Sequence, residues 1–103
     1  MQIKSLKKRT SVKPGLKGVK LRNSIFKNTN FNETDFTGCD LSSSVFDNCN
    51  FIRATFENTV LEKCDFRTSF NFSIDPERNR ISKAKFSLAG IAGLLDKYEI
   101  EID

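Results

Sequence analysis

Large apolar residues recur at every fifth position over about half of the chain. The spacing begins at Leu16 and continues without a slip to Phe66. An α-helix repeats every 3.6 residues and a strand every 2, so neither element keeps these positions on one face. We expect ten of them to form the core: Leu21, Phe26, Phe31, Phe36, Leu41, Phe46, Phe51, Phe56, Leu61 and Phe66.

A small residue stands two positions before each of these apolar residues from Ser24 onward. Residues two apart in an extended segment point the same way, so the small residues should also face inward. Cys39, Cys49 and Cys64 all occupy this position. We expect them to be inert core thiols, because burial raises a thiol pKa and no short ligand spacing such as CxxC is present.

Similar residues also recur twenty positions apart. Leu21, Leu41 and Leu61 share one such column, and the next column holds only Phe. Stacked coils of twenty residues would place these like side chains directly on one another. Asn30 and Asn50 share an outward column, where their amides are expected to form a ladder.

Units such as "CDLSS", "ATFEN" and "KCDFR" resemble the pentapeptide-repeat family. The resemblance covers residues 16 to about 70 and implies an all-β fold, a right-handed quadrilateral β-helix with one pentapeptide per side. The segment from "FRTSF" to the last residue is similar to the ending of bacterial pentapeptide-repeat proteins of unassigned activity. Those proteins look longer on the N-terminal side.

The repeat breaks at Asn71, which is flanked by Phe70 and Phe72. The break places Phe72 in outward phase, one coil above Ile52. Asp75 and Pro76 then favour a turn. Ile81 and Phe86 return to the five-residue phase and predict one last unit.

Residues 87–97 carry apolar residues at helical spacing and predict a short α-helix with Ser87 as its N-cap. Residues 98–103 alternate and predict a short strand. The helix is expected to cover the open end of the coils, because repeat proteins need such caps. A dimerisation or partner helix is the alternative, and the two roles are compatible.

Charge and composition divide the chain into three parts: a basic leader at 1–15, the β-helix at 16–72, and the turn, last unit, cap and strand at 73–103. The leader carries five Lys or Arg and no acid, which suits a solvated terminus, with contact to nucleic acid or an anionic surface as the alternative. Neither a membrane span of about 20 apolar residues nor a secretory signal is expected. Three cysteines with no sign of an oxidising compartment favour the cytoplasm.

Catalytic, cofactor-binding and metal-binding residues are not expected, because the chain has no His and no phosphate-loop or nucleophile motif. We therefore expect a non-enzymatic scaffold that binds an unidentified protein or a second copy of itself, with no membrane or nucleic-acid partner. An uncovered N-terminal ring of Leu16, Leu21, Phe26 and Phe31 is one expected self-association surface. The resemblance also leaves open a DNA mimic that acts on gyrase or topoisomerase. Outward apolar residues that could form an interaction surface are Ile25, Val45, Ile52, Phe72, Leu88, Ile91 and Leu95.

Overall fold

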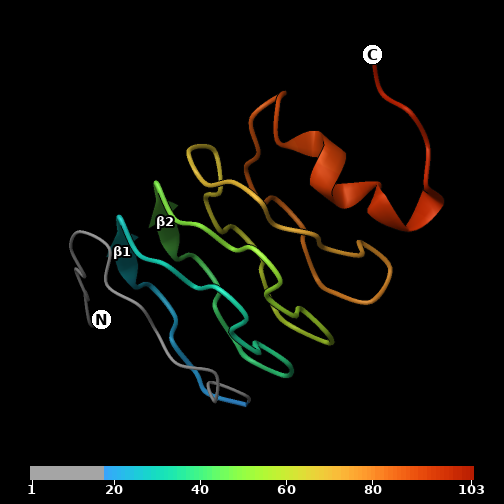
Figure 1. The fold of residues 1–103 in the computed structure, drawn as a ribbon. Helices are drawn as coiled ribbons and strands as arrows, with labels where there is room; N and C mark the ends of the chain where they lie inside the picture. The colour runs from blue at the N-terminus through green and yellow to red at the C-terminus, as the bar shows by residue number, and fades with distance from the viewer. Residues whose placement is uncertain (1–17) are drawn as a thin grey trace.

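The computed structural model describes residues 18–103, so the basic leader at 1–15 and Leu16 lie outside the described residues. Four elements are present: β1 (Ile25–Lys27), β2 (Val45–Asp47) and two 3-10 helices, η1 (Ile91–Leu94) and η2 (Asp96–Tyr98). The rest of the described chain consists of extended single residues and tight turns, which Figure 1 shows as successive coils side by side with the helices at the C-terminal end.

Neighbouring coils pair in parallel with a register of twenty residues. β1 pairs with β2 so that Phe26 lies opposite Phe46. Isolated bridges repeat the same offset along the stack, for example between Asp40 and Val60 and between Asp65 and Lys85. The twenty-residue period of the sequence is therefore the length of one coil, and the pairing is that of a β-helix.

Tight turns form corners of the coil. The N–H of Thr34 donates to the carbonyl of Phe31 at 3.1 Å, and Glu33 between them has a φ of 60°. A positive φ at the third residue and a bond between the first and fourth define a type II turn. The five-residue unit is therefore a short extended side followed by a corner.

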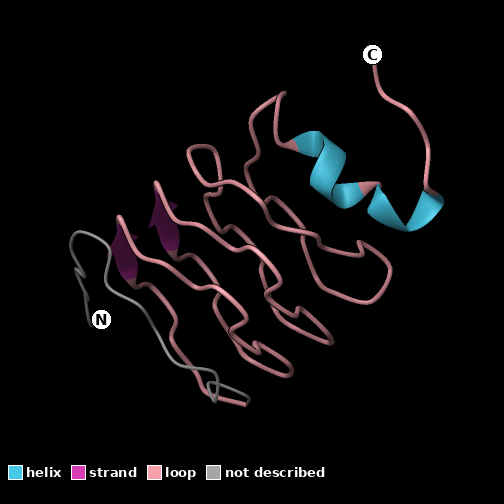
Figure 2. Ribbon diagram, viewed as in Figure 1, coloured by secondary structure: helices cyan, strands magenta, loops and turns pink. Residues whose placement is uncertain are grey.

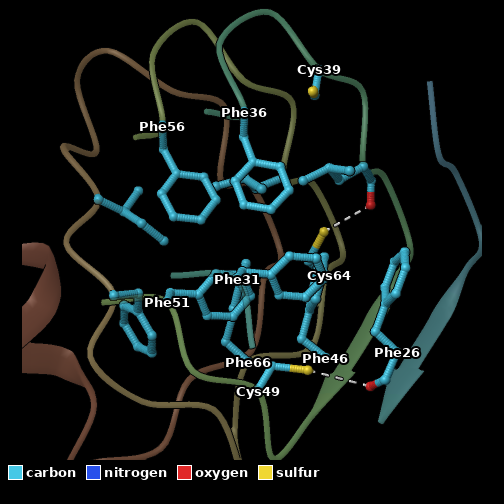
Figure 3. Packing of buried hydrophobic residues seen from close by; sticks show 14 residues of the cluster. Phe26, Phe31, Phe36, Cys39, Phe46, Cys49, Phe51, Phe56, Cys64 and Phe66 are labelled. Atoms are coloured by element: carbon cyan, nitrogen blue, oxygen red, sulfur yellow. Dashed lines mark hydrogen bonds between the residues drawn. The ribbon is translucent and has the colours of Figure 1, made fainter. Parts of the chain in front are cut away.

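The core is a stack of aromatic rings (Figure 3). Phe31 and Phe51 lie one coil apart with ring centroids 5.1 Å apart and planes 8° from parallel. Phe46 and Phe66 repeat this at 5.0 Å and 10°. Adjacent sides of one coil meet edge to face instead, as Phe26 and Phe31 do at 81°. Both geometries are favourable for aromatic pairs.

Nine of the ten expected core residues are buried, and Leu21 in the first described coil is partly buried. Phe26 and Phe31 are only 5% and 0% exposed. The expectation that these two rings stand open at the N-terminal end is therefore wrong.

The small inward residues satisfy carbonyl groups of the core residues one coil below. The Thr59 hydroxyl donates to the carbonyl of Phe36 at 2.8 Å, and the Ser69 hydroxyl donates to that of Phe46 at 2.6 Å. Each donor stands 23 residues after its acceptor. The inward residue at this position is small and polar because its side chain must fit inside the coil and also donate a hydrogen bond to a buried carbonyl.

The expected outward position of Phe72 is wrong. Phe72 is 5% exposed, and its ring packs 5.6 Å from those of Phe66 and Phe86. Asn71 takes a left-handed conformation with a φ of 63°. The inward apolar position therefore shifts by one residue, from position 71 to Phe72. Ile74 is buried as well, at 1% exposure.

The last unit returns to register as expected. Arg80 bridges to Val60, and Phe86 stacks on Phe66 with centroids 5.4 Å apart. Directly before Arg80, the side chain of Asn79 is buried and donates to the carbonyl of Phe56 at 3.0 Å. Asn79 thus replaces the small inward residue of the other coils.

The expected amide ladder lies in another column. Asn30 and Asn50 bridge through their backbones, while the Asn50 side chain accepts from the Nδ2 of Asn71 at 3.0 Å. The side-chain ladder forms instead between Asn28 and Asn48, at 2.7 Å.

The expected α-helix over 87–97 is replaced by η1 and η2, which are 3-10 helices joined at Leu95 (Figure 2). Ser87 forms a capping hydrogen bond just before η1, because its hydroxyl accepts from the N–H of Gly90 at 3.0 Å. The expected strand over 98–103 is also absent: Tyr98 belongs to η2, and residues 100–103 are neither helix nor strand.

Candidate interaction surfaces

The described residues hold neither an obvious metal site nor a membrane-spanning helix. Among residues 18–103 there is no group of three or more Cys, Asp or Glu that could hold a metal ion. Within the same range, no helix has the length and apolar character needed to cross a membrane.

The three cysteines lie inside the coils as expected, and all are free thiols. Cys64 donates to the carbonyl of Leu41 at 2.9 Å, and Cys49 lies 3.5 Å from that of Phe26 (Figure 3). Burial raises the pKa of Cys49 to about 11 and that of Cys64 to about 12. Burial also raises the pKa of Cys39. Thiolates are the reactive form, so these thiols are unreactive near neutral pH.

The outer faces of the coils are lined by ion pairs between acids and arginines. Arg22 contacts Asp40 at 2.7 Å, and Arg53 contacts Glu33 at 3.1 Å. These arginines are more than half exposed, so each pair contributes little to stability. Their main effect is on charge, because each of these acids has a cation beside it.

Several expected surface residues lie on these faces without forming an open patch. Ile25 and Val45 pair between β1 and β2, and both are partly buried, as is Ile52. Phe72 is buried in the core. The coil sides therefore supply only partly covered apolar side chains.

We define the cap as residues 87–98, which lie over the Phe72 side of the last coil. Gly93 and Gly90 stand directly on the Phe72 ring, where a Cβ on Gly90 would be 3.1 Å from Cζ. The N–H of Ile74 donates to the carbonyl of Gly93 at 2.9 Å, which continues the hydrogen-bond ladder of the coils into the cap.

An ion-pair cluster fixes the other end of the cap. The Lys97 ammonium lies 3.2 Å from Asp75 and 2.6 Å from Glu77, both on the loop that follows Phe72. The hydrogen bond from the backbone N–H of Glu77, assisted by Lys97, lowers the pKa of Asp75. The cap is therefore held at two points, by glycine packing and by Lys97.

The cap carries exposed apolar side chains. Leu88 is 88% exposed and Ile91 is 39% exposed, while Leu95 is partly buried. Leu95 also lines a shallow groove of 270 Å³ together with the tail residues Ile100 and Ile102. We call Leu88, Ile91 and Leu95 the cap surface. The structure brings these three expected surface residues together on one segment, apart from Ile25, Val45 and Ile52.

Sequence reasoning missed other residues at this end. Phe70 is 43% exposed and lines a second groove of 380 Å³ between the last coil and the cap. Ile100 and Ile102 are more than half exposed. The signal that could have shown the groove is the pair of glycines three residues apart, Gly90 and Gly93, since glycine allows close approach.

The profile described as "Pentapeptide repeats (8 copies)" matches residues 16–51 and 29–67, together just over half of the chain. No curated protein matches the chain. Among solved structures, two trypsin-treated forms of QnrB1, a plasmid-mediated fluoroquinolone resistance protein, are similar to it. One is 14% identical over 84% of this chain and 60% of that chain, with a TM-score of 0.29. The other is 12% identical over 96% of this chain and 99% of that chain, with a TM-score of 0.28.

This chain thus spans less than two thirds of the first of these structures. The profile match agrees with the five-residue period, the coil register and the buried Phe and Leu columns. The chain belongs to the pentapeptide-repeat family.

Proposed function

We propose that this protein is a non-enzymatic scaffold, a right-handed quadrilateral β-helix that acts by binding protein through its cap surface. The proposed partner is a second copy of the chain. The observation that supports it is Leu88, a large apolar side chain that is 88% exposed at the C-terminal end of the stack. Contiguous exposed apolar surface is typical of interaction sites.

The cap is suited to binding because it is held in place. Gly93 on Phe72 and Lys97 between Asp75 and Glu77 fix the segment that carries Leu88, Ile91 and Leu95. A surface fixed before binding loses little conformational entropy when it binds.

A two-fold arrangement would place the same cap surface on both sides of the interface. Leu88, Ile91 and Leu95 would then be buried against their own copies. Such an interface needs no complementary patch elsewhere on the molecule.

A DNA mimic is the alternative function. It requires a dominant acidic face, whereas residues 18–103 carry 13 Asp and Glu against 11 Lys and Arg. Arg78 pairs with Glu57 and Arg80 with Glu62, so acids on the coil faces are partly neutralised in place. This distribution favours the scaffold.

Sedimentation equilibrium of the full chain over a wide concentration range tests the proposal. We expect a monomer–dimer equilibrium that Leu88→Glu shifts toward monomer, because the change puts a charge into the apolar interface. Val19→Glu is the matched control, since Val19 is also exposed but lies at the other end of the stack.

A wild-type protein that stays monomeric at all concentrations would overturn the self-association proposal. A gyrase supercoiling assay with the same samples examines the alternative. Inhibition that persists in Leu88→Glu at full strength would favour the DNA mimic.

A further inference from the structure

The last coil ends in an edge with unpaired backbone groups. In the coil before it, the N–H groups of Leu61, Lys63 and Phe66 donate to the next coil at 2.7, 3.0 and 2.8 Å. Their counterparts twenty residues later are Ile81, Lys83 and Phe86. Within residues 18–103, no acceptor lies at hydrogen-bond distance from these three N–H groups.

The acceptors of this edge are unpaired as well. The carbonyls of Thr59 and Cys64 accept from the coil above at 3.0 and 2.8 Å. The corresponding carbonyls of Asn79 and Ala84 receive no donor from the described part of the chain. Residues 79–86, which we call the terminal edge, thus form a template for one more strand.

Among the described residues, the cap makes no hydrogen bond or ion pair with the terminal edge. Its hydrogen bonds and ion pairs to the rest of the described chain involve Ile74, Asp75 and Glu77, on the Phe72 side of the coil. The carbonyl of Gly93 accepts from the N–H of Ile74, as a group of a further coil would. Within the described chain, Ile74 is the only residue of the coils whose backbone bonds to the cap in this way. On the terminal edge, Ser82 and Lys83 are exposed.

The tail, residues 99–103, has the composition of the missing strand. Ile100 and Ile102 alternate with Glu99, Glu101 and Asp103, so an extended tail would have an apolar face and an acidic face. Both isoleucines are more than half exposed, and residues 100–103 make no hydrogen bond within the described chain. Figure 1 shows the tail running away from the coils.

The charges of the two segments are complementary. The terminal edge carries Arg80, Lys83 and Lys85 and no acid, while the tail carries three acids and no base. Opposite charges on adjacent strands stabilise pairing and favour one partner over others.

The tail of the same chain cannot continue its own coil in register. Residue 101 stands twenty positions after Ile81, so a continued coil would place the carboxylate of Glu101 on the core column. A buried unpaired carboxylate is strongly disfavoured. A tail from another molecule is free to choose a register with its isoleucines inward.

We propose that residues 99–103 of a second copy of the chain pair as an added strand with the terminal edge, reciprocally in a two-fold dimer. This inference rests on the self-association proposed above and adds the segment that determines its geometry. The added strand would pair with one side of the terminal edge, through the carbonyl of Asn79 and the N–H of Ile81, and would cover Ile81 with Ile100 or Ile102. Strand addition to an exposed edge is a general mode of peptide recognition.

The first test is sedimentation equilibrium of the full-length double variant Ile100→Lys and Ile102→Lys. We expect its dimer dissociation constant to rise about tenfold or more, as the loss of a few hydrogen bonds and two apolar contacts predicts. Val19→Lys is the control and should leave the constant unchanged. An unchanged constant in the double variant would overturn the tail pairing but keep the cap-surface dimer. A monomeric wild type would overturn both.

The second test is disulfide cross-linking between two differently sized versions of the full chain. One carries Ser82→Cys on the terminal edge and the other carries Glu101→Cys in the tail. We expect a mixed cross-linked dimer, because the native cysteines are buried and inert. Cross-linked dimers of only one version would overturn the proposal. A chain that carries both changes gives a further check at high dilution. An intramolecular disulfide in that chain would also overturn the proposal, because it would show that the tail pairs with the edge of its own molecule.

Discussion

Gly93 lies directly on Phe72: a Cβ atom on Gly93 would stand 2.8 Å from Cδ1 and 3.0 Å from Cε1 of that ring. Real Cβ atoms do not approach so closely, so the cap can rest on the core only where residue 93 has no side chain.

We therefore expect Gly93→Ala to lower the free energy of unfolding by about 1–3 kcal/mol, the usual cost of overpacking. Gly90→Ala should cost less, because its Cβ would be 3.1 Å from Cζ of Phe72 and from the Ser87 hydroxyl, which can turn away. Urea unfolding of both variants checks the order. Equal, small effects would mean that the cap does not depend on this contact.

The stacked rings should carry much of the stability. Phe46 is 1% exposed and lies between Phe26 and Phe66, 5.3 and 5.0 Å away. Phe46→Ala is expected to cost about 3–5 kcal/mol. Phe70→Ala removes the same atoms from a side chain that is 43% exposed and should cost clearly less. Thermal unfolding compares the two, and similar costs would contradict the assignment of the core.

The hydroxyl of Ser69 joins two adjacent coils. It donates to the carbonyl of Phe46 at 2.6 Å and accepts from the N–H of Cys49 at 3.2 Å. Ser69→Ala leaves both buried groups without this partner and should cost about 1–3 kcal/mol. Ser69→Cys is the control, because Cys64 makes the same bond to Leu41 in another column. Denaturant midpoints should follow the order wild type, Ser69→Cys, Ser69→Ala.

The buried thiols should resist alkylation in the folded protein and react in denaturant. At neutral pH we expect Cys49 and Cys64 to label only as fast as the protein unfolds, because burial raises their pKa to about 11 and about 12. Rapid labelling of the native protein, read by mass spectrometry, would contradict their position.

The same thiols give a pH dependence with a definite sign. Above the ordinary thiol pKa of 9.0 the unfolded chain loses the Cys49 proton while the folded chain keeps it. The contribution of Cys49 to stability is therefore complete below pH 9.0 and is lost as the pH rises toward about 11. Cys49→Ala should show a shallower decline over this range in urea titrations at several pH values.

The coils could be predicted from the sequence. Each pentapeptide side has the same local geometry, and each side chain meets its equivalent twenty residues away, so Phe31 on Phe51 and Leu41 on Leu61 follow from periodicity alone. The buried thiols follow for the same reason, because Cys39, Cys49 and Cys64 stand in the small inward phase.

The C-terminal end could not be predicted in the same way, because the repeat no longer constrains the chain there. The left-handed Asn71 moves Phe72 into the core, which the period alone placed outside. Helical spacing predicted an α-helix, but Gly90 and Gly93 weaken helix formation and their contact with Phe72 selects two short 3-10 turns. Alternation around Ile100 and Ile102 predicted a strand, yet a strand exists only when another edge supplies its hydrogen bonds.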